Sequence, residues 1–234
     1  MSIEKFKAEL NQLGISYTDH QLFQLEQYYQ LLLEWNQKMN LTAIIQKEEV
    51  YLKHFYDSLT LTKIINLNEQ ETLCDIGTGA GFPGIVLKIF FPHLKMTLVD
   101  SLQKRTIFLK NTIDVLQLKN VEVCNARAEE YALKNREKFD VVTARAVAHL
   151  RILLEYGIPM VNTDKYFIAM KGNINNELKE SETTILKLGC EKQDILSFSL
   201  PMDAGNRTLI LFRKKEKTNL LFPRKYNEMK KKSL

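Results

Sequence analysis

The sequence predicts an α/β fold built on a mostly parallel sheet with helices on both faces. From residue 72 onward, short β-rich runs alternate with longer stretches of helical periodicity, which implies crossover connections between parallel strands. The first of these runs leads into a glycine-rich turn and then a helical pattern. The 234 residues, 45% of them hydrophobic, suffice for one large domain, or one domain and an appendage, without disulfides or metal.

Residues 1–65 are expected to form an N-terminal helical extension. Thr18 to Gln21 is a capping-box pattern that predicts the start of a helix. The apolar residues that follow recur at steps of three and four and form one stripe: Leu25, Tyr28, Leu32, Trp35 and Met39. A second helix is expected to begin near Glu48 and Glu49, whose charges suit a helix N-terminus, and to run through about Thr62. Because the apolar stripe must be buried, the extension is expected to pack on the α/β domain.

The α/β domain is expected to span residues 66–213. Its seven candidate strands are 72–76, 96–100, 121–124, 139–143, 166–170, 191–198 and 208–212. The candidate helices between them are 83–91, 102–118, 147–156 and 174–188. Ligands on sheets of this kind bind at the carboxyl ends of the strands, so the loops after these strands are expected to form the site.

The basic charge of the chain is concentrated at its C-terminal end. Residues 213–234 contain nine basic and two acidic residues, a net charge of +7 within a total of +5, which leaves −2 for residues 1–212. Residues 214–234 are therefore treated as a basic tail. Two interpretations remain open: a solvated tail, or an arm that contacts the phosphates of a nucleic acid.

Cysteine, histidine and hydropathy patterns exclude several classes of protein. The three cysteines, Cys74, Cys124 and Cys190, form no CxxC pair and predict neither a disulfide framework nor a zinc site. The four histidines show no metal spacing, so no metal site is expected. The N-terminal residues do not resemble a signal peptide, and no run approaches the roughly 18 apolar residues of a membrane span. A cytoplasmic protein that does not enter a membrane is expected.

The glycine-rich turn has two competing interpretations as a ligand site. Gly79, Gly81 and Gly84 satisfy GxGxxG, and Asp100 ends the next strand 21 residues after Gly79, a pattern typical of dinucleotide-binding dehydrogenases. Asp75, two residues before Gly77, argues against a dinucleotide because its carboxylate would repel a pyrophosphate on the same turn.

S-adenosylmethionine fits the same residues better. It carries positive charges and no phosphate, so Asp75 could attract it directly or through water. Asp100 serves either cofactor, because both contain an adenosine ribose with two hydroxyls. Gly77, Gly79 and Gly81, at alternate positions, let the backbone approach a flat ligand closely. The motif therefore favours a class I methyltransferase over a nicotinamide enzyme or a glycine turn that binds nothing.

Five stretches carry a more specific resemblance. They are LEWNQKMNLT at 33–42, HFYDSL at 54–59, DIGTGAGFPG at 75–84, FDVVTARA at 139–146 and MKG at 170–172. In this order they resemble the bacterial 16S ribosomal RNA guanine-N7 methyltransferase G family, earlier known as glucose-inhibited division protein B. The ending departs from the family: the chain has FPRKYN at 222–227 and no later glycine.

The resemblance implies a Rossmann-like class I S-adenosylmethionine-dependent methyltransferase fold with a mostly parallel seven-stranded sheet and the helical extension. It implies transfer of the methyl group to N7 of a specific guanine in 16S ribosomal RNA, with that RNA or the small-subunit assembly as partner. A monomer is expected. Together with Asp75 and Gly79 from the turn, it implies cofactor contacts at Gly77, Phe82, Asp100, Ser101, Leu102, Ala128, Glu129 and Arg145.

The chemistry of the acceptor predicts no catalytic acid or base. Guanine N7 has an in-plane lone pair and no proton to remove, so in-line displacement needs alignment and no general base. Arg145, Lys171 and Arg207 are the RNA-binding candidates because they lie near strand ends or loops. His54, Asp57 and Ser58 share a helical face that either edges the active site or links helix to sheet. The remaining alternative is an RNA-binding module without methyl transfer, against which the intact glycine turn argues.

Overall fold

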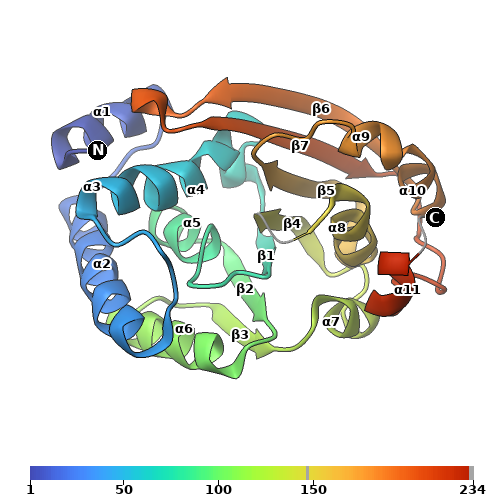
Figure 1. Ribbon diagram of the computed structural model, residues 1–234, viewed down its shortest axis with the longest axis horizontal. Helices are drawn as coiled ribbons and strands as arrows, with labels where there is room; N and C mark the ends of the chain where they lie inside the picture. Colours follow the sequence, from blue (N-terminus) through green and yellow to red (C-terminus); the bar gives the residue numbers. More distant parts are fainter. Residues whose placement is uncertain (146–147, 232–234) are drawn as a thin grey trace.

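A seven-stranded sheet forms the centre of the computed structural model, which describes residues 1–145 and 148–231 (Figure 1). Its strand order is β3-β2-β1-β4-β5-β7-β6. The strands are β1 (Thr72–Ile76), β2 (Lys95–Asp100), β3 (Val121–Asn125), β4 (Phe139–Arg145), β5 (Val161–Lys171), β6 (Cys190–Ser199) and β7 (Asn206–Lys214). β1 to β5 pair in parallel and β7 is antiparallel to both of its neighbours. The predicted mostly parallel sheet is confirmed.

All seven candidate strands are present, and the largest difference is at the start of β5. This strand begins at Val161, five residues before the predicted start. Its first half includes the exposed residues Thr163 and Asp164, so it lacks the apolar run by which the buried half was identified. The register against β4 also shifts between Phe139 and Val141.

One face of the sheet is covered by helices from the first half of the chain. They are α1 (Ile3–Gln12), α2 (Asp19–Met39), the helical run of α3 (Lys47–Val50), η1 (Tyr51–Tyr56), α4 (Asp57–Leu59) and η2 (Thr60–Lys63), then α5 (Gly84–Phe90) and α6 (Gln103–Val115). Leu73, Leu98 and Val141 belong to the core on this face together with Leu25 and Phe55 of the N-terminal helices. The extension therefore shares one hydrophobic core with the sheet.

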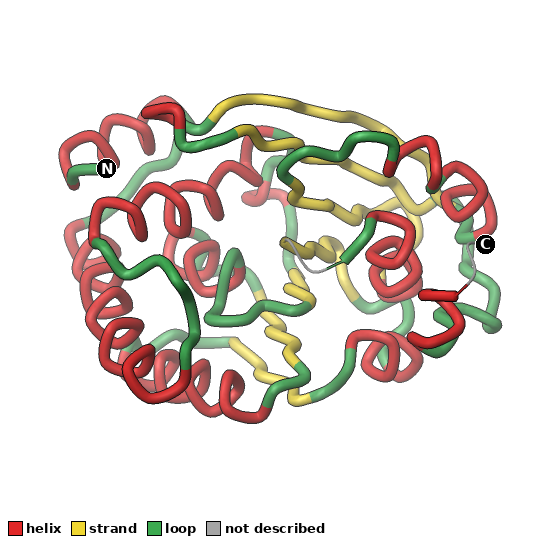
Figure 2. Tube along the Cα trace, viewed as in Figure 1, coloured by secondary structure: helices red, strands yellow, loops and turns green. Residues whose placement is uncertain are grey.

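The opposite face is covered by helices from the second half of the chain, as Figure 2 shows. They are α7 (Ala128–Lys134), α8 (Leu150–Gly157), α9 (Glu177–Glu180), α10 (Glu182–Lys187) and α11 (Tyr226–Lys231). Cys74, Val99 and Val142 belong to the core on this face, each next in sequence to a residue of the other core. This alternation is the period of two that a sheet buried on both faces requires.

The predicted N-terminal helices are present, with one irregularity. The capping box is complete: the hydroxyl of Thr18 accepts from the backbone N–H of Gln21, whose side-chain oxygen accepts from the N–H of Thr18. The predicted second helix is a continuous helical run from Lys47 to Lys63 with a π-helical segment at Tyr51–Tyr56. Among the described residues, no helix combines the length and the apolar character needed to cross a bilayer.

Two segments in the second half depart from the expected helices and tail. The helix expected at 174–188 is two short helices, α9 and α10, that meet at Ser181. The helix expected at 147–156 corresponds to α8, which begins at Leu150. Positions 146 and 147 lie outside the described residues. The segment expected as a basic tail from 214 is largely docked: Lys214 ends β7, and the chain then returns to form α11 beside α8 (Figure 1). Residues 232–234 lie outside the described part.

Candidate active site

A cavity of about 600 Å³ opens at the carboxyl ends of β1, β2 and β4. Parallel sheets bind ligands at this edge. The cavity lies where the strand order reverses, with β2 and β3 on one side of β1 and β4 and β5 on the other. Nine of the ten residues predicted as cofactor contacts line it: Gly77, Gly79, Phe82, Asp100, Ser101, Leu102, Ala128, Glu129 and Arg145. The structure thus brings together residues from four loops.

The glycine turn forms one wall of this cavity. The N–H groups of Gly77 and Thr78 both donate to the carbonyl of Val99, at 2.8 and 3.1 Å, which folds the turn back over β2. Gly77, Gly79 and Gly81 have φ values of 65°, 62° and 98°, a region that favours glycine. A Cβ atom on Gly81 would lie 2.7 Å from the hydroxyl oxygen of Tyr28, so α2 packs directly against the turn.

Asp75 is the predicted contact that does not line the cavity. Its side chain is fully buried, and Oδ2 accepts from Thr78 Oγ1 at 2.6 Å and from the N–H of Gly84 at 2.8 Å. Burial raises the pKa of Asp75 to about 7, and the two hydrogen bonds partly offset that rise. The carboxyl group therefore braces the turn from behind. Sequence spacing identified its importance but not the direction in which the side chain points.

Asp100 connects the glycine turn to the loop after β2. Its Oδ2 accepts from the N–H of Gly79 at 3.0 Å and from Arg105 Nη1 at 3.2 Å, and Oδ1 accepts from the N–H of Leu102 at 2.9 Å. The residue is only 3% exposed, so its orientation is held by these bonds. Asp100 also lines the cavity, and a carboxylate at this position can accept hydrogen bonds from ligand hydroxyls.

Phe82 lines the cavity and contacts two polar side chains there. The imidazole of His54 stacks on its ring with centroids 4.5 Å apart, and the guanidinium of Arg145 lies 5.2 Å from the ring centroid. Burial, together with the nearby charge of Arg145, lowers the pKa of His54 to about 4. The ring is neutral at physiological pH and contacts Thr42 Oγ1 through Nε2 at 2.9 Å.

The opposite wall contains a carboxylate and two tyrosines. Glu129, at the start of α7, is 9% exposed, and within the described part of the chain its carboxylate takes part in no hydrogen bond or ion pair. Tyr156 of α8 and Tyr226 of α11 line this side and were missed by sequence reasoning. No local pattern marked either tyrosine, because each reaches the cavity through a long-range contact.

A second cavity of about 390 Å³ adjoins the first and shares His54 and Arg145 with it. All three RNA-binding candidates line it, together with Asp57. Asp57, 3% exposed, accepts from Arg145 Nη1 at 3.1 Å and from Arg207 Nε at 2.8 Å, so one carboxylate orients both arginines. The helical face of His54 and Asp57 therefore both edges the site and links the N-terminal helices to the sheet.

Lys171 is less available than the two arginines. It is 9% exposed, its Nζ lies 2.8 Å from Glu177 Oε2, and it donates to the carbonyl of Ala148 at 2.9 Å. These two bonds hold its charge against the end of β5. The side chain of Arg207 is 23% exposed and therefore offers more surface to a ligand.

Together, these features define a class I S-adenosylmethionine-dependent methyltransferase. Asp100 and Glu129 line the cavity beside the glycine turn, and their carboxylates suit ligand hydroxyls and a positive charge, while Arg105, Arg127 and Arg145 also line it. A solved S-adenosylmethionine-dependent methyltransferase from Aquifex aeolicus is similar in fold, with a TM-score of 0.52 and 18% identity over 71% of this chain and 93% of that one.

The chain belongs to the rRNA small subunit methyltransferase G family, whose model matches residues 21–210. A relative named ribosomal RNA small subunit methyltransferase G from Bacillus cytotoxicus is 47% identical over 228 residues, covering 96% of this chain and 95% of the relative. The protein of the same name from Bacillus subtilis is 46% identical with the same coverage. The resemblance inferred from the five sequence stretches is confirmed.

Proposed function

We propose that this chain transfers the methyl group of S-adenosylmethionine to N7 of a specific guanine in 16S ribosomal RNA. The observation that carries the proposal is the pair of adjoining cavities, which share His54 and Arg145. The larger cavity contains the glycine turn and the carboxylates of Asp100 and Glu129, which a cofactor with hydroxyls and positive charge suits, and the smaller one is lined by basic side chains that suit RNA. The names of the relatives, ribosomal RNA small subunit methyltransferase G, agree with one cavity for the cofactor and one for RNA.

The residues of the chain would act by binding and orienting. S-adenosylmethionine, when bound, supplies a methyl group on a sulfonium that is already a good leaving group. Because guanine N7 carries no proton, no side chain has to remove one, and no general base is assigned. Alignment of two bound reactants is worth up to about 7–11 kcal/mol in favourable systems. The neutral imidazole of His54 adds no positive charge beside a cationic reacting centre.

On the acceptor side, Arg145 and Arg207 are proposed to hold the RNA. Both guanidinium groups are oriented by Asp57, and Arg207 has N–H donors beyond the one that Asp57 accepts. Such donors match phosphate oxygens or O6 of guanine. Lys171, whose ammonium already contacts Glu177 and the carbonyl of Ala148, is proposed to contribute chiefly by closing this end of the cavity.

Loss of the gene tests the reaction and the target together. Small-subunit RNA from a deletion strain should lose one reductive cleavage site of 7-methylguanosine, and the wild-type gene should restore it. An unchanged cleavage pattern would refute the proposed acceptor. RNA that is bound without any methyl transfer to it would instead support the non-enzymatic RNA-binding module.

Two variants test the acceptor side of the proposal. Arg207→Ala should reduce methylation and RNA affinity about 10-fold, the effect of losing one charged hydrogen bond, while S-adenosylmethionine affinity stays unchanged. Arg213→Ala is the matched control, since Arg213 pairs with exposed Asp164 away from both cavities. Equal losses of RNA and cofactor affinity in Arg207→Ala would point to misfolding, and no loss of either would exclude the residue.

The cofactor assignment has its own measurement. Calorimetry on the folded protein should detect binding of S-adenosylmethionine and none of NADH, and the reverse result would refute the assignment. We also propose that the chain acts in the cytoplasm, where ribosomal RNA is processed, and as a monomer. Cell fractionation and light scattering during size-exclusion chromatography test these two statements, and neither result affects the proposed chemistry.

A further inference from the structure

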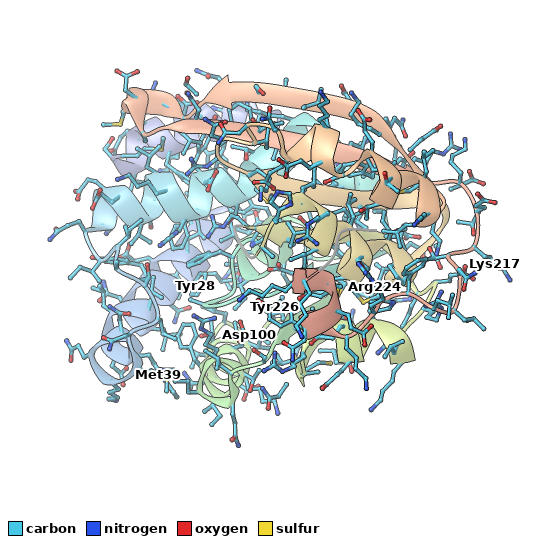
Figure 3. The ribbon with its side chains drawn as sticks, turned by 45° about the vertical axis from the view of Figure 1, so that its right-hand side comes forward. Tyr28, Met39, Asp100, Lys217, Arg224 and Tyr226 are labelled. Carbon is cyan, nitrogen blue, oxygen red and sulfur yellow. The ribbon has the colours of Figure 1, made fainter. Side chains whose placement is uncertain are left out.

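The C-terminal segment, residues 217–231, reaches the cofactor cavity although it is the part of the chain farthest from the glycine turn in sequence. Tyr226, the first residue of α11, lines the cavity. Its side chain is half-buried and packs against the core that covers the second face of the sheet. Figure 3 labels Tyr226 and Asp100, which both line the cavity, together with Arg224 from the same C-terminal segment as Tyr226.

Arg224 attaches this segment to α8 through Glu155. The backbone N–H and Nε of Arg224 donate to Glu155 Oε1 at 2.9 and 2.8 Å, and Nη2 donates to Oε2 at 2.8 Å. Glu155 is only 1% exposed, and both of its carboxylate oxygens accept hydrogen bonds from Arg224. A bidentate pair between an arginine and a buried carboxylate fixes the relative orientation of the two side chains as well as neutralising their charges. The pair holds the backbone two residues before Tyr226.

Two further arginines hold the segment at other points. Arg136 donates to the carbonyls of Thr218, Asn219 and Phe222, and Arg151 donates to the carbonyl of Met229. Met229, a residue of α11, is fully buried. The segment is therefore attached to the domain before, at and after Tyr226.

The neighbours of Tyr226 locate it on the adenosine side of the cavity. Tyr156 follows the anchoring residue Glu155 in α8 and lines the same wall. Glu129, Tyr156 and Tyr226 all line this cavity, and burial raises the pKa of Tyr156. The family resemblance implies that Ala128 and Glu129 contact the cofactor; a small residue there admits an adenine ring, and a carboxylate can accept from its amino group. An aromatic ring at this position suits contact with a flat base.

We propose that the C-terminal segment completes the cofactor site, with Tyr226 contacting the adenosine part of the ligand and Arg224 acting as its positioning residue through Glu155. The inference rests on S-adenosylmethionine being the cofactor. It gives part of the basic C-terminal end a different role from the phosphate-contacting arm: Arg224 is used internally, and the ring that it positions belongs to the cofactor site.

The test uses the full-length protein and calorimetric titration with S-adenosylhomocysteine, which contains the adenosine without the reactive methyl group. Tyr226→Ala should weaken binding about 10-fold, the effect of removing one aromatic contact, and Tyr226→Phe should bind within about 2-fold of wild type. Leu221→Ala, an exposed apolar residue of the same segment, is the control for Tyr226→Ala and should not change affinity.

Arg224 is tested by a double-mutant cycle. Arg224→Gln should weaken binding several-fold, and the double variant Arg224→Gln, Tyr226→Ala should bind no more weakly than Tyr226→Ala alone, because Arg224 acts through Tyr226. Lys225→Ala removes one positive charge from the neighbouring exposed position and should leave affinity unchanged. A purely structural role for Arg224 would instead give additive losses.

Several outcomes separate this proposal from its alternatives. If wild-type protein binds S-adenosylhomocysteine and Tyr226→Ala binds it equally well, the inference is overturned. If wild type fails to bind, the cofactor assignment fails instead. If Tyr226→Ala does not fold by circular dichroism, Tyr226→Phe and Arg224→Gln decide, and unchanged affinity in Arg224→Gln refutes the positioning. Weaker RNA binding with unchanged cofactor affinity in Tyr226→Ala would return the segment to the phosphate-arm interpretation.

Discussion

The two walls of the cofactor cavity are built in different ways. The glycine-turn wall is backbone, folded onto Val99 and braced from behind by the carboxyl of Asp75. The C-terminal wall consists of side chains, Tyr156 and Tyr226, and the second of these depends on the Arg224 attachment. The first wall comes from about ten consecutive residues, whereas the second joins residues 69 positions apart.

The difference teaches which wall tolerates change. At Gly81 and Gly84 the turn packs so closely on buried side chains that an added Cβ would lie less than 3 Å from them, so it would displace the turn or its neighbours. A wall made of attached side chains can lose one attachment and remain largely in place. We therefore expect substitutions in the glycine turn to affect folding and binding together, and substitutions in the C-terminal segment to affect binding or local order with little effect on global stability.

The largest effect is expected for Gly84→Ala, which adds a methyl group behind the turn. The added Cβ would lie 2.3 Å from Leu98 Cδ2 and 2.9 Å from Asp75 Oδ2. Overpacking of this kind should lower the free energy of unfolding by about 2–3 kcal/mol, measured by urea denaturation. Gly172→Ala is the control, since its nearest atom would be the carbonyl oxygen of Asn206 at 4.0 Å. Equal stability of the two variants would show that the turn is not closely packed at Gly84.

The next effect is expected for Asp100→Asn, which keeps the shape of the side chain and removes its charge. Asp100 holds the N–H groups of Gly79 and Leu102, so the change weakens both the turn and the carboxylate offered to ligand hydroxyls. Affinity for S-adenosylmethionine should fall by about 2 kcal/mol, roughly 30-fold, in calorimetry. Asp114→Asn, at an exposed position of α6, should bind like wild type. A loss confined to stability would show that Asp100 supports the turn without contacting the ligand.

The pH dependence of stability should reveal the buried carboxyl of Asp75. Its folded pKa of about 7 lies above the ordinary value of 3.8, so the native state holds a proton that the unfolded state has released between these values. The contribution of Asp75 is therefore present at low pH and is lost as the pH rises through 7, by at most about 1.4 kcal/mol per pH unit.

The comparison with Asp75→Asn isolates this contribution, because the variant has no proton to lose at position 75. The difference in unfolding free energy, wild type minus variant, should decrease from pH 5 to pH 8 and become constant above that range. The opposite trend expected from His54, whose pKa is lowered to about 4, is present in both proteins and cancels. A difference that is flat across the range would show that Asp75 is ionised throughout.

The smallest effect on global stability is expected for Arg136→Ala, which removes one attachment of the C-terminal segment. Three carbonyls lose their donor, so residues 218–222 should open locally while the free energy of unfolding changes by about 1 kcal/mol or less. Chymotrypsin should then cleave after Leu220 or Leu221 faster than in wild type. Lys134→Ala, an exposed change on the preceding helix, should show wild-type cleavage. Unchanged cleavage in Arg136→Ala would mean that the other attachments suffice.

Sequence reasoning identified the elements whose signals are local. All seven strands and the capping box at Thr18 were predicted because apolar runs and cap residues act over a few positions. Nine of the ten predicted cofactor contacts line one cavity because they lie at or within a few residues of the carboxyl ends of four neighbouring strands. The helix expected at 174–188 is divided at Ser181, whose buried hydroxyl bonds to the carbonyl of Glu177, a detail that periodicity does not contain.

What the sequence contained by itself was the order of strands and helices, the glycine turn and the family, because each is written in consecutive residues. The direction of Asp75 depended on the tertiary structure, since a carboxyl at a strand end can face a ligand or the turn behind it. So did the joining of Asp57 to two arginines and the docking of the basic C-terminal end at the cofactor cavity. The contacts of Asp57 and of the C-terminal end join residues 69 to 150 positions apart, and only the folded sheet brings such positions within hydrogen-bonding distance.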